Sequence, residues 1–392
     1  MSTSRAGDRL PVLLVYGTRP EAIKVAPVVK ELERHSRLRP VVAVTGQHRE
    51  MLDQVNQVFD ITPDFDLNIL SHGQTLYGIT TKALIGLESV IGQVAPAALL
   101  VQGDTTTAFA AALAAFYQQV PVVHLEAGLR TSNRYNPFPE EMNRRLASQL
   151  TDVHLAPTAL ARDNLLLENV PRERITVTGN TVIDALQVVT SAPRPVHDPQ
   201  FAQFLQRAAD RPVLLVTSHR RESWGAPIGH TARAVAELAR RYPDLMILLP
   251  AHRNPIVRDA ILPPLEGLDN VVVTEPLDYP DFCQALQRST VVLTDSGGVQ
   301  EEAPSLGIPV LVLRETTERP EAVSAGSAKL VGTDEYRIVD EVSRLLTNRA
   351  AYDAMAQARN PYGDGAAARR GVDAIAAFLG VGEPPAEFDP GT

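Results

Sequence analysis

Residues 10–35 read LPVLLVYGTRPEAIKVAPVVKELERH, which is a short apolar run, a polar turn and an amphipathic stretch in succession. The run Leu10–Tyr16 is apolar at every position, as is typical of a strand buried on both faces of a parallel sheet. Apolar residues then recur at i, i+3, i+4 and i+7, which predicts a helix over residues 21–35. A strand, a turn and a helix in this order predict an α/β fold.

The same alternation continues along the rest of the chain in two sets. Residues 191–212 separate the sets, and their prolines and lack of a strand pattern predict a linker. We therefore expect two doubly wound α/β domains that face a cleft, with ligands outside the carboxyl ends of the strands. The other predicted strands are 40–44, 97–101, 122–125, 153–156 and 175–177 before the linker, and 213–217, 245–249, 271–274, 291–294 and 309–313 after it.

The composition is that of an ordinary globular protein and argues against several classes of partner. The 392 residues are 44% hydrophobic and 21% charged, with a formal net charge of −9 at pH 7. This charge argues against a nucleic-acid-binding protein, which needs a basic face, but allows a small anionic ligand held by local arginines. A single cysteine, Cys283, and the lack of an apolar leader or membrane-length segment lead us to expect a cytoplasmic protein.

Charged, glycine-containing turns follow the predicted strands and indicate a polar cleft. Three carboxylates, Asp104, Glu126 and Glu140, lie at or near strand ends of the first half. Carboxylates grouped in a cleft can divide acid and base roles when their surroundings set their pKa values apart. Alternatively, Asp104 caps a helix predicted over residues 105–117, and Glu140 is a salt-bridged glutamate in the first turn of another helix.

The segment Asp295-Ser296-Gly297-Gly298 precedes a predicted helix and has the features of a phosphate-binding site. Two glycines let the backbone approach an anion, and the start of the helix supplies free N–H groups and a positive dipole end. The alternative is a plain helix start capped by Asp295 or Ser296. Arg19, in the first strand-to-helix turn, either reaches a phosphate or lies on the surface.

Neither a metal site nor a nicotinamide site is predicted. The sequence has no His-Glu-x-x-His and no clustered cysteines and histidines, so His219 and His252 are candidate general bases, charge partners or buried imidazoles. A G-x-G-x-x-A match at residues 363–368 follows a polar segment, so it lacks the strand that precedes a dinucleotide-binding loop. We interpret it as a turn into the last helix, predicted over residues 366–379.

Six stretches complete the pattern, at residues 17–24, 103–106, 124–130, 179–184, 295–302 and 317–321. Together these motifs resemble one family, the non-hydrolysing bacterial UDP-N-acetylglucosamine 2-epimerases. The resemblance extends from about Leu10 to Leu379 and implies the GT-B architecture. It implies a Rossmann-like domain over residues 1–190 with the acid/base carboxylates and a second over 191–360 that binds UDP. A helix over 361–381 would return to the first domain, and we expect a disordered tail over 382–392.

The resemblance also implies roles for single residues. Asp104, Glu126 and Glu140 match the proposed acid/base carboxylates of the family. His219 matches a position that binds UDP, and we also regard it as a candidate catalytic residue. No cofactor is implied; the ligands would be UDP-GlcNAc and UDP-ManNAc, and the protein a homodimer without nucleic-acid or membrane partners. The remaining matches are Arg19, Ser296, Gly297, Gly298, Glu302 and Arg319 around UDP, Phe282 beside the uracil, and Lys24 in the ligand site.

The implied reaction is reversible inversion at C2, by elimination of UDP to 2-acetamidoglucal and re-addition. It needs an anion clamp for the leaving diphosphate and carboxylates that take and return a proton. Three other activities stay open on the same motifs. They are a glycosyltransferase with an acceptor groove, a hydrolysing epimerase that releases free N-acetylmannosamine, and a catalytically silent UDP-sugar sensor.

Regulated members of this family bind a second UDP-GlcNAc that activates them. Two positions depart from the pattern of that second site, because Gly73 stands where some members carry an arginine and Glu50 replaces a glutamine. The first change removes a bidentate phosphate partner, and the second adds repulsion toward a diphosphate, so we expect weak or absent activation. The positions that match the second site are Gln47, Glu140, Arg220 and His252.

Overall fold

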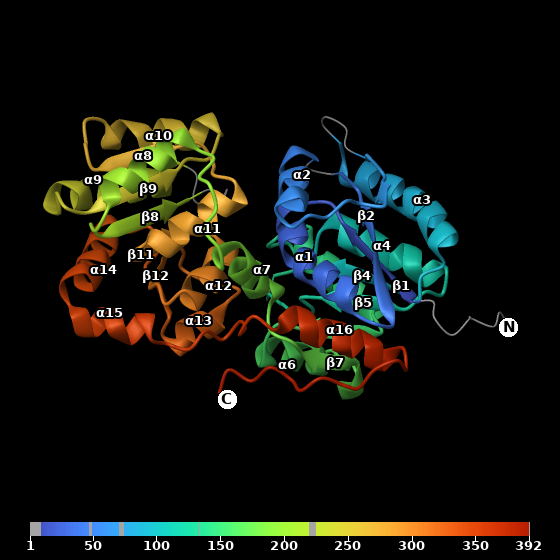
Figure 1. Ribbon diagram of the computed structural model, residues 1–392. Helices are drawn as coiled ribbons and strands as arrows, with labels where there is room; N and C mark the ends of the chain where they lie inside the picture. The colour runs from blue at the N-terminus through green and yellow to red at the C-terminus, as the bar shows by residue number, and fades with distance from the viewer. Residues whose placement is uncertain (1–8, 47–48, 70–73, 132, 219–224, 392) are drawn as a thin grey trace. The chain divides into compact units, whose positions relative to one another are not determined.

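The computed structural model describes residues 9–46, 49–69, 74–131, 133–218 and 225–391 (Figure 1). The chain forms two compact units: residues 1–185 with 362–392 form unit 1, and residues 186–361 form unit 2. Each unit is built around one parallel sheet, which confirms the predicted α/β class with two doubly wound sheets. Among the described segments, no helix combines the length and apolar composition that a bilayer span requires.

The sheet of unit 1 has seven parallel strands in the order β3-β2-β1-β4-β5-β6-β7. The strand order reverses between β1 and β4, which are hydrogen-bonded neighbours. All six strands predicted for this half are present, and the two-residue β3 was not predicted because it is too short to carry a pattern. The strands are β1 (Leu10–Tyr16), β2 (Leu38–Val44), β3 (Phe65–Asp66), β4 (Ala98–Gln102), β5 (Val122–Leu125), β6 (Val153–Ala156) and β7 (Ile175–Val177).

Helices follow the strands of unit 1 and bury an apolar core against the sheet. Ala108, Ala111 and Ala115 of α4 pack with Leu13 and Val101 of the two central strands. Small alanines let α4 approach the sheet closely. The helices are α1 (Arg19–Arg34), α2 (Arg49–Val58), α3 (Leu76–Val94), α4 (Thr106–Tyr117), α5 (Glu140–Leu150), α6 (Ala159–Leu167), the 3-10 helix η1 (Arg172–Arg174), α7 (Thr181–Thr190), which continues into unit 2, and α16 (Ala367–Phe378).

The sheet of unit 2 has six parallel strands in the order β10-β9-β8-β11-β12-β13, and its order reverses between β8 and β11. Five strands were predicted, and β13 was missed. The strands are β8 (Val213–Thr217), β9 (Met246–Pro250), β10 (Val271–Thr274), β11 (Val291–Thr294), β12 (Val310–Val312) and β13 (Ala328–Leu330). The helices are α8 (Pro199–Ala208), α9 (Ala226–Arg241), α10 (Pro255–Leu265), α11 (Tyr279–Arg288), α12 (Gly297–Ser305), α13 (Pro320–Ala325), α14 (Glu335–Thr347) and α15 (Arg349–Ala356).

The stretch predicted to be a linker, residues 191–212, contains the helix α8. Its start has a side-chain cap, because Asp198 accepts from the backbone N–H of Phe201 at 2.8 Å. Pro199 occupies the first helical position, where its missing N–H costs nothing. Phe201 and Phe204 are buried along one face. The linker prediction was wrong here because prolines and the lack of a strand pattern do not exclude a helix that begins at a proline.

The tail predicted to be disordered is ordered up to Gly391. The backbone N–H of Phe388 donates to the carbonyl oxygen of Val177 at 2.8 Å, and the Phe388 side chain is buried. Glu387 pairs with Arg172 at 2.7 Å. The disorder prediction was wrong because one aromatic anchor and one ion pair hold a segment whose composition alone indicates a coil. Before the tail, α16 packs against α1 and β6 of unit 1.

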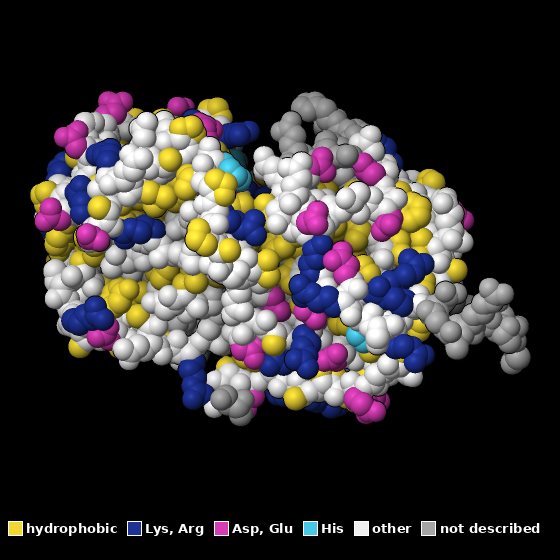
Figure 2. Space-filling model, in the orientation of Figure 1, with side chains coloured by type: hydrophobic (Ala, Val, Ile, Leu, Met, Phe, Trp, Pro, Cys, Tyr) yellow, Lys and Arg dark blue, Asp and Glu magenta, His cyan; other side chains and the backbone are white. Residues whose placement is uncertain are grey.

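The face of unit 1 in Figure 2 mixes both signs of charge around α1 and α16. Lys30 pairs with Glu33 at 3.1 Å and Arg34 with Glu31 at 3.1 Å, both along α1. Such exposed pairs contribute little to stability. Alternation of this kind is typical of a solvated surface and does not create the basic field that a polyanion needs.

Candidate active site

In both sheets, several of the predicted polar turns follow the two strands between which the strand order reverses. In unit 1, residues 17–24 follow β1 and Asp104 comes shortly after β4. In unit 2, Ser218 follows β8 and residues 295–298 follow β11. At such a reversal the connecting helices leave on opposite faces, so a crevice opens where ligands bind in doubly wound sheets.

Glu126 lies directly after β5, and donor side chains from separate elements surround its carboxylate. Lys24 of α1 forms an ion pair with Oε1, and the Nδ2 of Asn180 donates to the same oxygen at 3.0 Å. Gln102, the last residue of β4, donates to Oε2 at 2.5 Å. The backbone of Glu126 has φ +65°, a left-handed conformation that costs a residue with a Cβ about 1 kcal/mol or more. These contacts orient the carboxylate and stabilise its charge.

Asp104 occupies a different electrostatic environment from Glu126. Its Oδ2 lies 2.7 Å from a terminal nitrogen of the buried Arg144. Burial raises the pKa of Asp104, Arg144 opposes this, and the charges of Glu126 and Glu140 add to the rise. Asp104 is not the cap of α4, because Thr105 accepts from the N–H of Ala108 at 3.1 Å. The Asp104 carboxyl therefore does not cap the helix. It pairs with Arg144, and the charges of Glu126 and Glu140 act on it.

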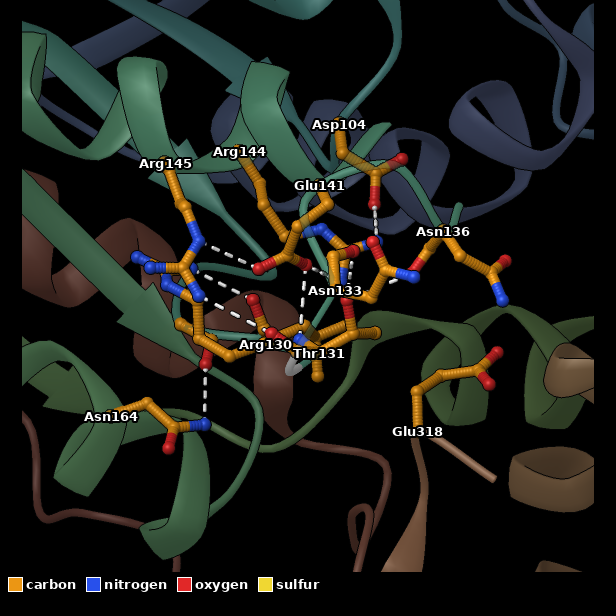
Figure 3. A network of polar contacts seen from close by, with 12 residues as sticks. Asp104, Arg130, Thr131, Asn133, Asn136, Glu141, Arg144, Arg145, Asn164 and Glu318 are labelled. Atoms are coloured by element: carbon orange, nitrogen blue, oxygen red, sulfur yellow. Dashed lines mark hydrogen bonds and ion pairs between the residues drawn. The ribbon is translucent and has the colours of Figure 1, made fainter. Parts of the chain in front are cut away.

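A buried network holds Arg144 in place (Figure 3). Glu141 is fully buried; one of its oxygens lies 2.7 Å from Nε of Arg145 and the other 3.4 Å from Arg144. The backbone N–H of Thr131 also donates to Glu141 at 3.0 Å. The neighbouring Glu140 starts α5 and is only half-buried. The first-turn salt bridge expected of Glu140 is therefore formed by Glu141, and the sequence analysis did not single out Glu141 or Arg144.

Two further buried groups that the sequence analysis missed fix the loops after β1 and β4. Glu21 accepts from the backbone N–H groups of Gly17 at 3.0 Å and Thr18 at 2.7 Å, which holds the turn that leads to Arg19. In β5, His124 Nε2 lies 2.7 Å from the carbonyl oxygen of Gly103. Burial lowers the pKa of His124 to about 4, so its ring is neutral at pH 7 and donates this bond.

In unit 2 the guanidinium of Arg319 lies against the first turn of α12. A Cβ at Gly297 would fall 2.5 Å from a terminal nitrogen of Arg319, so only glycine leaves room for this approach. Arg319 Nε is 2.7 Å from Glu301, and its NH1 is 2.7 Å from Glu318. Ser296 is the N-cap residue of α12, but its side chain makes no capping hydrogen bond. The start of α12 and a buried arginine therefore lie together at the segment for which the motif predicts an anion-binding site.

Glu302 and Phe282 lie in the same unit as this segment. Glu302 is in the second turn of α12, and its Oε1 accepts from the hydroxyl of Tyr279 at 3.2 Å. Tyr279 and the half-buried Phe282 belong to the first turn of α11. A carboxylate and an aromatic ring are thus positioned by two helices of unit 2.

Several predicted residues lie outside the described part of the chain. They are Gln47, Gly73, His219, Arg220 and the side chain of Glu50. His252 is described: it is exposed after β9, and its Nδ1 accepts from the backbone N–H of Asn254 at 3.1 Å. His252 is therefore not a buried imidazole.

One group of side chains among the described residues has the spacing of a cation site. The ligand atoms of His197, Asp278 and Asp281 lie within 4.8 Å of one another. However, the Asp281 carboxylate accepts from the backbone N–H of His197 at 3.0 Å and of Asp198 at 2.8 Å. His197 Nδ1 contacts Asp278 at 2.5 Å, so these groups already satisfy one another without an ion.

Comparison with known proteins extends over both units. A model of the UDP-N-acetylglucosamine 2-epimerase family matches residues 30–376. The UDP-N-acetylglucosamine 2-epimerase of Salmonella typhimurium is 50% identical over 374 residues, which cover 94% of this chain and 99% of that protein. The S. aureus MnaA–UDP co-structure has a TM-score of 0.89 and 45% identity, covering 97% of this chain and 100% of that one. The Neisseria meningitidis UDP-GlcNAc 2-epimerase bound to UDP-GlcNAc has a TM-score of 0.87 and 47% identity, covering 94% and 100%. These similarities confirm the predicted GT-B architecture.

Proposed function

The chain belongs to the UDP-N-acetylglucosamine 2-epimerase family, and we propose that it interconverts UDP-GlcNAc and UDP-ManNAc by elimination and re-addition of UDP. The observation that carries this mechanism is the pair of carboxyl groups in unit 1. Glu126 is held by Lys24, Gln102 and Asn180, while Asp104 has a raised pKa and faces Arg144. Two carboxyl groups in unlike surroundings suit a reaction that needs one base and one acid.

The proposed elimination moves one proton to the protein and releases UDP from C1. A carboxylate takes the proton from C2, the electrons of the C2–H bond form the C1–C2 double bond, and the C1–O bond breaks with its electron pair on the diphosphate. UDP then adds back to C1 while a carboxylic acid delivers a proton to the opposite face of C2. We assign the base and acid roles to Glu126 and Asp104, which exchange between the two directions of reaction. Glu140 and His219 complete the proposed catalytic set.

The leaving diphosphate needs positive groups that are already in place when the C1–O bond breaks. We propose that Arg319 and the start of α12 bind it. Preorganised donors of this kind stabilise the charge that develops on the leaving group. Arg319 supports this role because the lack of a side chain at Gly297 lets its guanidinium lie against the first turn of α12, the positive end of the helix dipole.

Transfer of the C2 proton to and from the protein predicts an isotope result. In D2O, without added NAD or metal, UDP-GlcNAc should convert to UDP-ManNAc and gain deuterium at C2, because solvent exchanges with the carboxyl proton. NMR and mass spectrometry of the nucleotide sugar measure this directly. Epimer with the original hydrogen fully retained would exclude the elimination. Free N-acetylmannosamine would indicate a hydrolysing enzyme, and binding without reaction would indicate a sensor or a transferase that lacks its acceptor.

Regulation by a second UDP-GlcNAc is expected to be weak, because Gly73 and Glu50 depart from the pattern of that site. The reverse reaction tests this expectation. Turnover that begins with UDP-ManNAc alone should start without a lag, whereas an activated enzyme would wait for UDP-GlcNAc. Initial rates with and without a trace of UDP-GlcNAc provide the measurement. A strong dependence on the added UDP-GlcNAc would show that the two changes leave the second site intact.

We also propose that the enzyme is a homodimer. Tyr77 and Ile85 of α3 and Phe116 and Tyr117 of α4 are each more than half exposed, and these two helices pack against each other. Large exposed apolar side chains on adjoining helices are typical of a surface that another protein covers.

A further inference from the structure

Asn180 makes contacts in unit 1 that link the Glu126 carboxylate to the backbone. Its Nδ2 donates to Glu126 Oε1 at 3.0 Å, and its Oδ1 accepts from the backbone N–H of Val182 at 3.1 Å. Its own backbone N–H donates to the carbonyl oxygen of Tyr362 at 2.6 Å. The residue is 3% exposed, so its amide is held away from water. Hydrogen bonds therefore hold both the backbone and the side chain of Asn180, and this restricts the orientation of the Glu126 carboxylate.

Asn180 also lies close to the two points at which the chain passes between the units. The chain leaves unit 1 after Ala185 and returns to it at Tyr362, so Asn180 contacts the returning segment close to both crossings. Gly179 has φ +85°, and a Cβ there would lie 3.3 Å from the Cα of Gly363. The two crossing segments thus approach each other backbone to backbone, with the side chain of Asn180 directed to Glu126.

We infer that Asn180 is a positioning residue that orients the Glu126 carboxylate for proton transfer and couples it to the two crossing segments. The catalytic part of this inference rests on the proposed function, in which Glu126 transfers a proton. Lys24 brings a positive charge to the same oxygen, and the family resemblance implies that this residue lies in the ligand site. Asn180 is a neutral donor, so it stabilises the carboxylate without depending on how the ligand charge is distributed.

The substitution Asn180→Asp separates this role from a structural one. Aspartate keeps the oxygen that accepts from Val182, so the start of α7 is preserved, but it replaces the donor to Glu126 with a second negative charge. Adjacent carboxylates resist being ionised together, so the pKa of Glu126 rises. We expect kcat at pH 7 to fall about tenfold or more, the acidic limb of the kcat profile to move by about one pH unit to higher pH, and the UDP Kd to stay within about twofold.

A matched control makes the same chemical change elsewhere. Asn348 caps α15 of unit 2, where its Oδ1 accepts from the N–H of Ala351 at 3.0 Å. Asn348→Asp should leave kcat, its pH profile and the UDP Kd unchanged. An Asn180→Asp enzyme with the wild-type kcat and pH profile would overturn the inference. If that variant does not fold, Asn180→Ser keeps an acceptor for Val182 and should still lower kcat about tenfold, and an unchanged kcat would overturn the inference.

A second readout does not need activity. In protein labelled with 13C-glutamate, Glu126→Gln identifies the carboxyl resonance of Glu126, and its titration is followed in wild type and Asn180→Asp. The inferred contact requires the titration to move to higher pH in the variant, and superimposable curves would disprove it. If wild-type protein does not epimerise UDP-GlcNAc, the proposed function fails while this titration still decides whether Asn180 controls Glu126.

Discussion

Replacing Glu126 with glutamine is expected to reduce kcat for epimerisation about 10²- to 10⁴-fold, the range that one positioned acid or base contributes. Glutamine has nearly the same shape, but its amide does not take a proton from C2. It also turns an NH2 group toward Lys24, Gln102 or Asn180, all of which are donors in the present structure. Steady-state kinetics with UDP-GlcNAc gives kcat, and calorimetry with UDP gives the affinity, which should stay within about twofold because no phosphate ligand has been removed.

Two further variants test the assignment. Asp104→Asn should lose turnover to a similar extent, with an added loss of stability because the buried Arg144 then faces a neutral amide. Glu33→Gln on the exposed face of α1 changes only a surface ion pair with Lys30 and should leave kcat unchanged. Full turnover in Glu126→Gln or in Asp104→Asn would show that the corresponding acid/base role is wrong.

Replacing Arg319 with glutamine is expected to weaken UDP binding and the fold together. Loss of charge-assisted hydrogen bonds to the diphosphate should raise the UDP Kd about 10- to 100-fold. Glu301, which is almost completely buried, loses its partner 2.7 Å away, and Glu318 loses one as well. Removing one partner of a buried ion pair costs about 3–5 kcal/mol of unfolding free energy. Calorimetry measures the first effect and denaturant unfolding the second.

A double variant separates the two effects of Arg319. In Arg319→Gln with Glu301→Gln, the buried carboxylate is neutralised, so part of the unfolding free energy should return. The UDP affinity should stay low, because the guanidinium is still missing. Recovery of UDP binding along with stability would mean that Arg319 supports the fold and does not bind the diphosphate.

Most strands were predictable because a strand buried on both faces must be apolar along its length. The runs at β1 and β5 have the predicted bounds. β13 was missed because its middle residue, Lys329, interrupts the apolar run; its ammonium pairs with Glu341 of α14. The helix α8 was missed for a different reason. Its one proline, Pro199, is compatible with the start of a helix, whereas a proline inside a helix would break it, and the cap by Asp198 marks Pro199 as a start.

From the residues alone, without the family resemblance, the candidate site was predictable only where its residues follow a strand or start a helix. Asp104, Glu126 and the glycines at 297 and 298 are of this kind, because topology brings strand ends together. Glu21, Glu141 and Asn180 are different, since their roles depend on which side chains the packed elements bring within 3 Å. A buried carboxylate in a sequence looks the same as an exposed one, and no spacing rule distinguishes Glu140 from Glu141.

The division of unit 1 into two separate stretches of sequence has a consequence for the order in which the protein is made. Residues 186–361, a complete unit, are synthesised between the two parts of the other. At a translation rate of about 5–20 residues per second, this takes roughly 10–35 s. During that time the surfaces of α1 and β6 that α16 covers are exposed on the ribosome. The second unit can therefore finish folding first, and the carboxylate site is completed only when residues from Tyr362 onward have emerged.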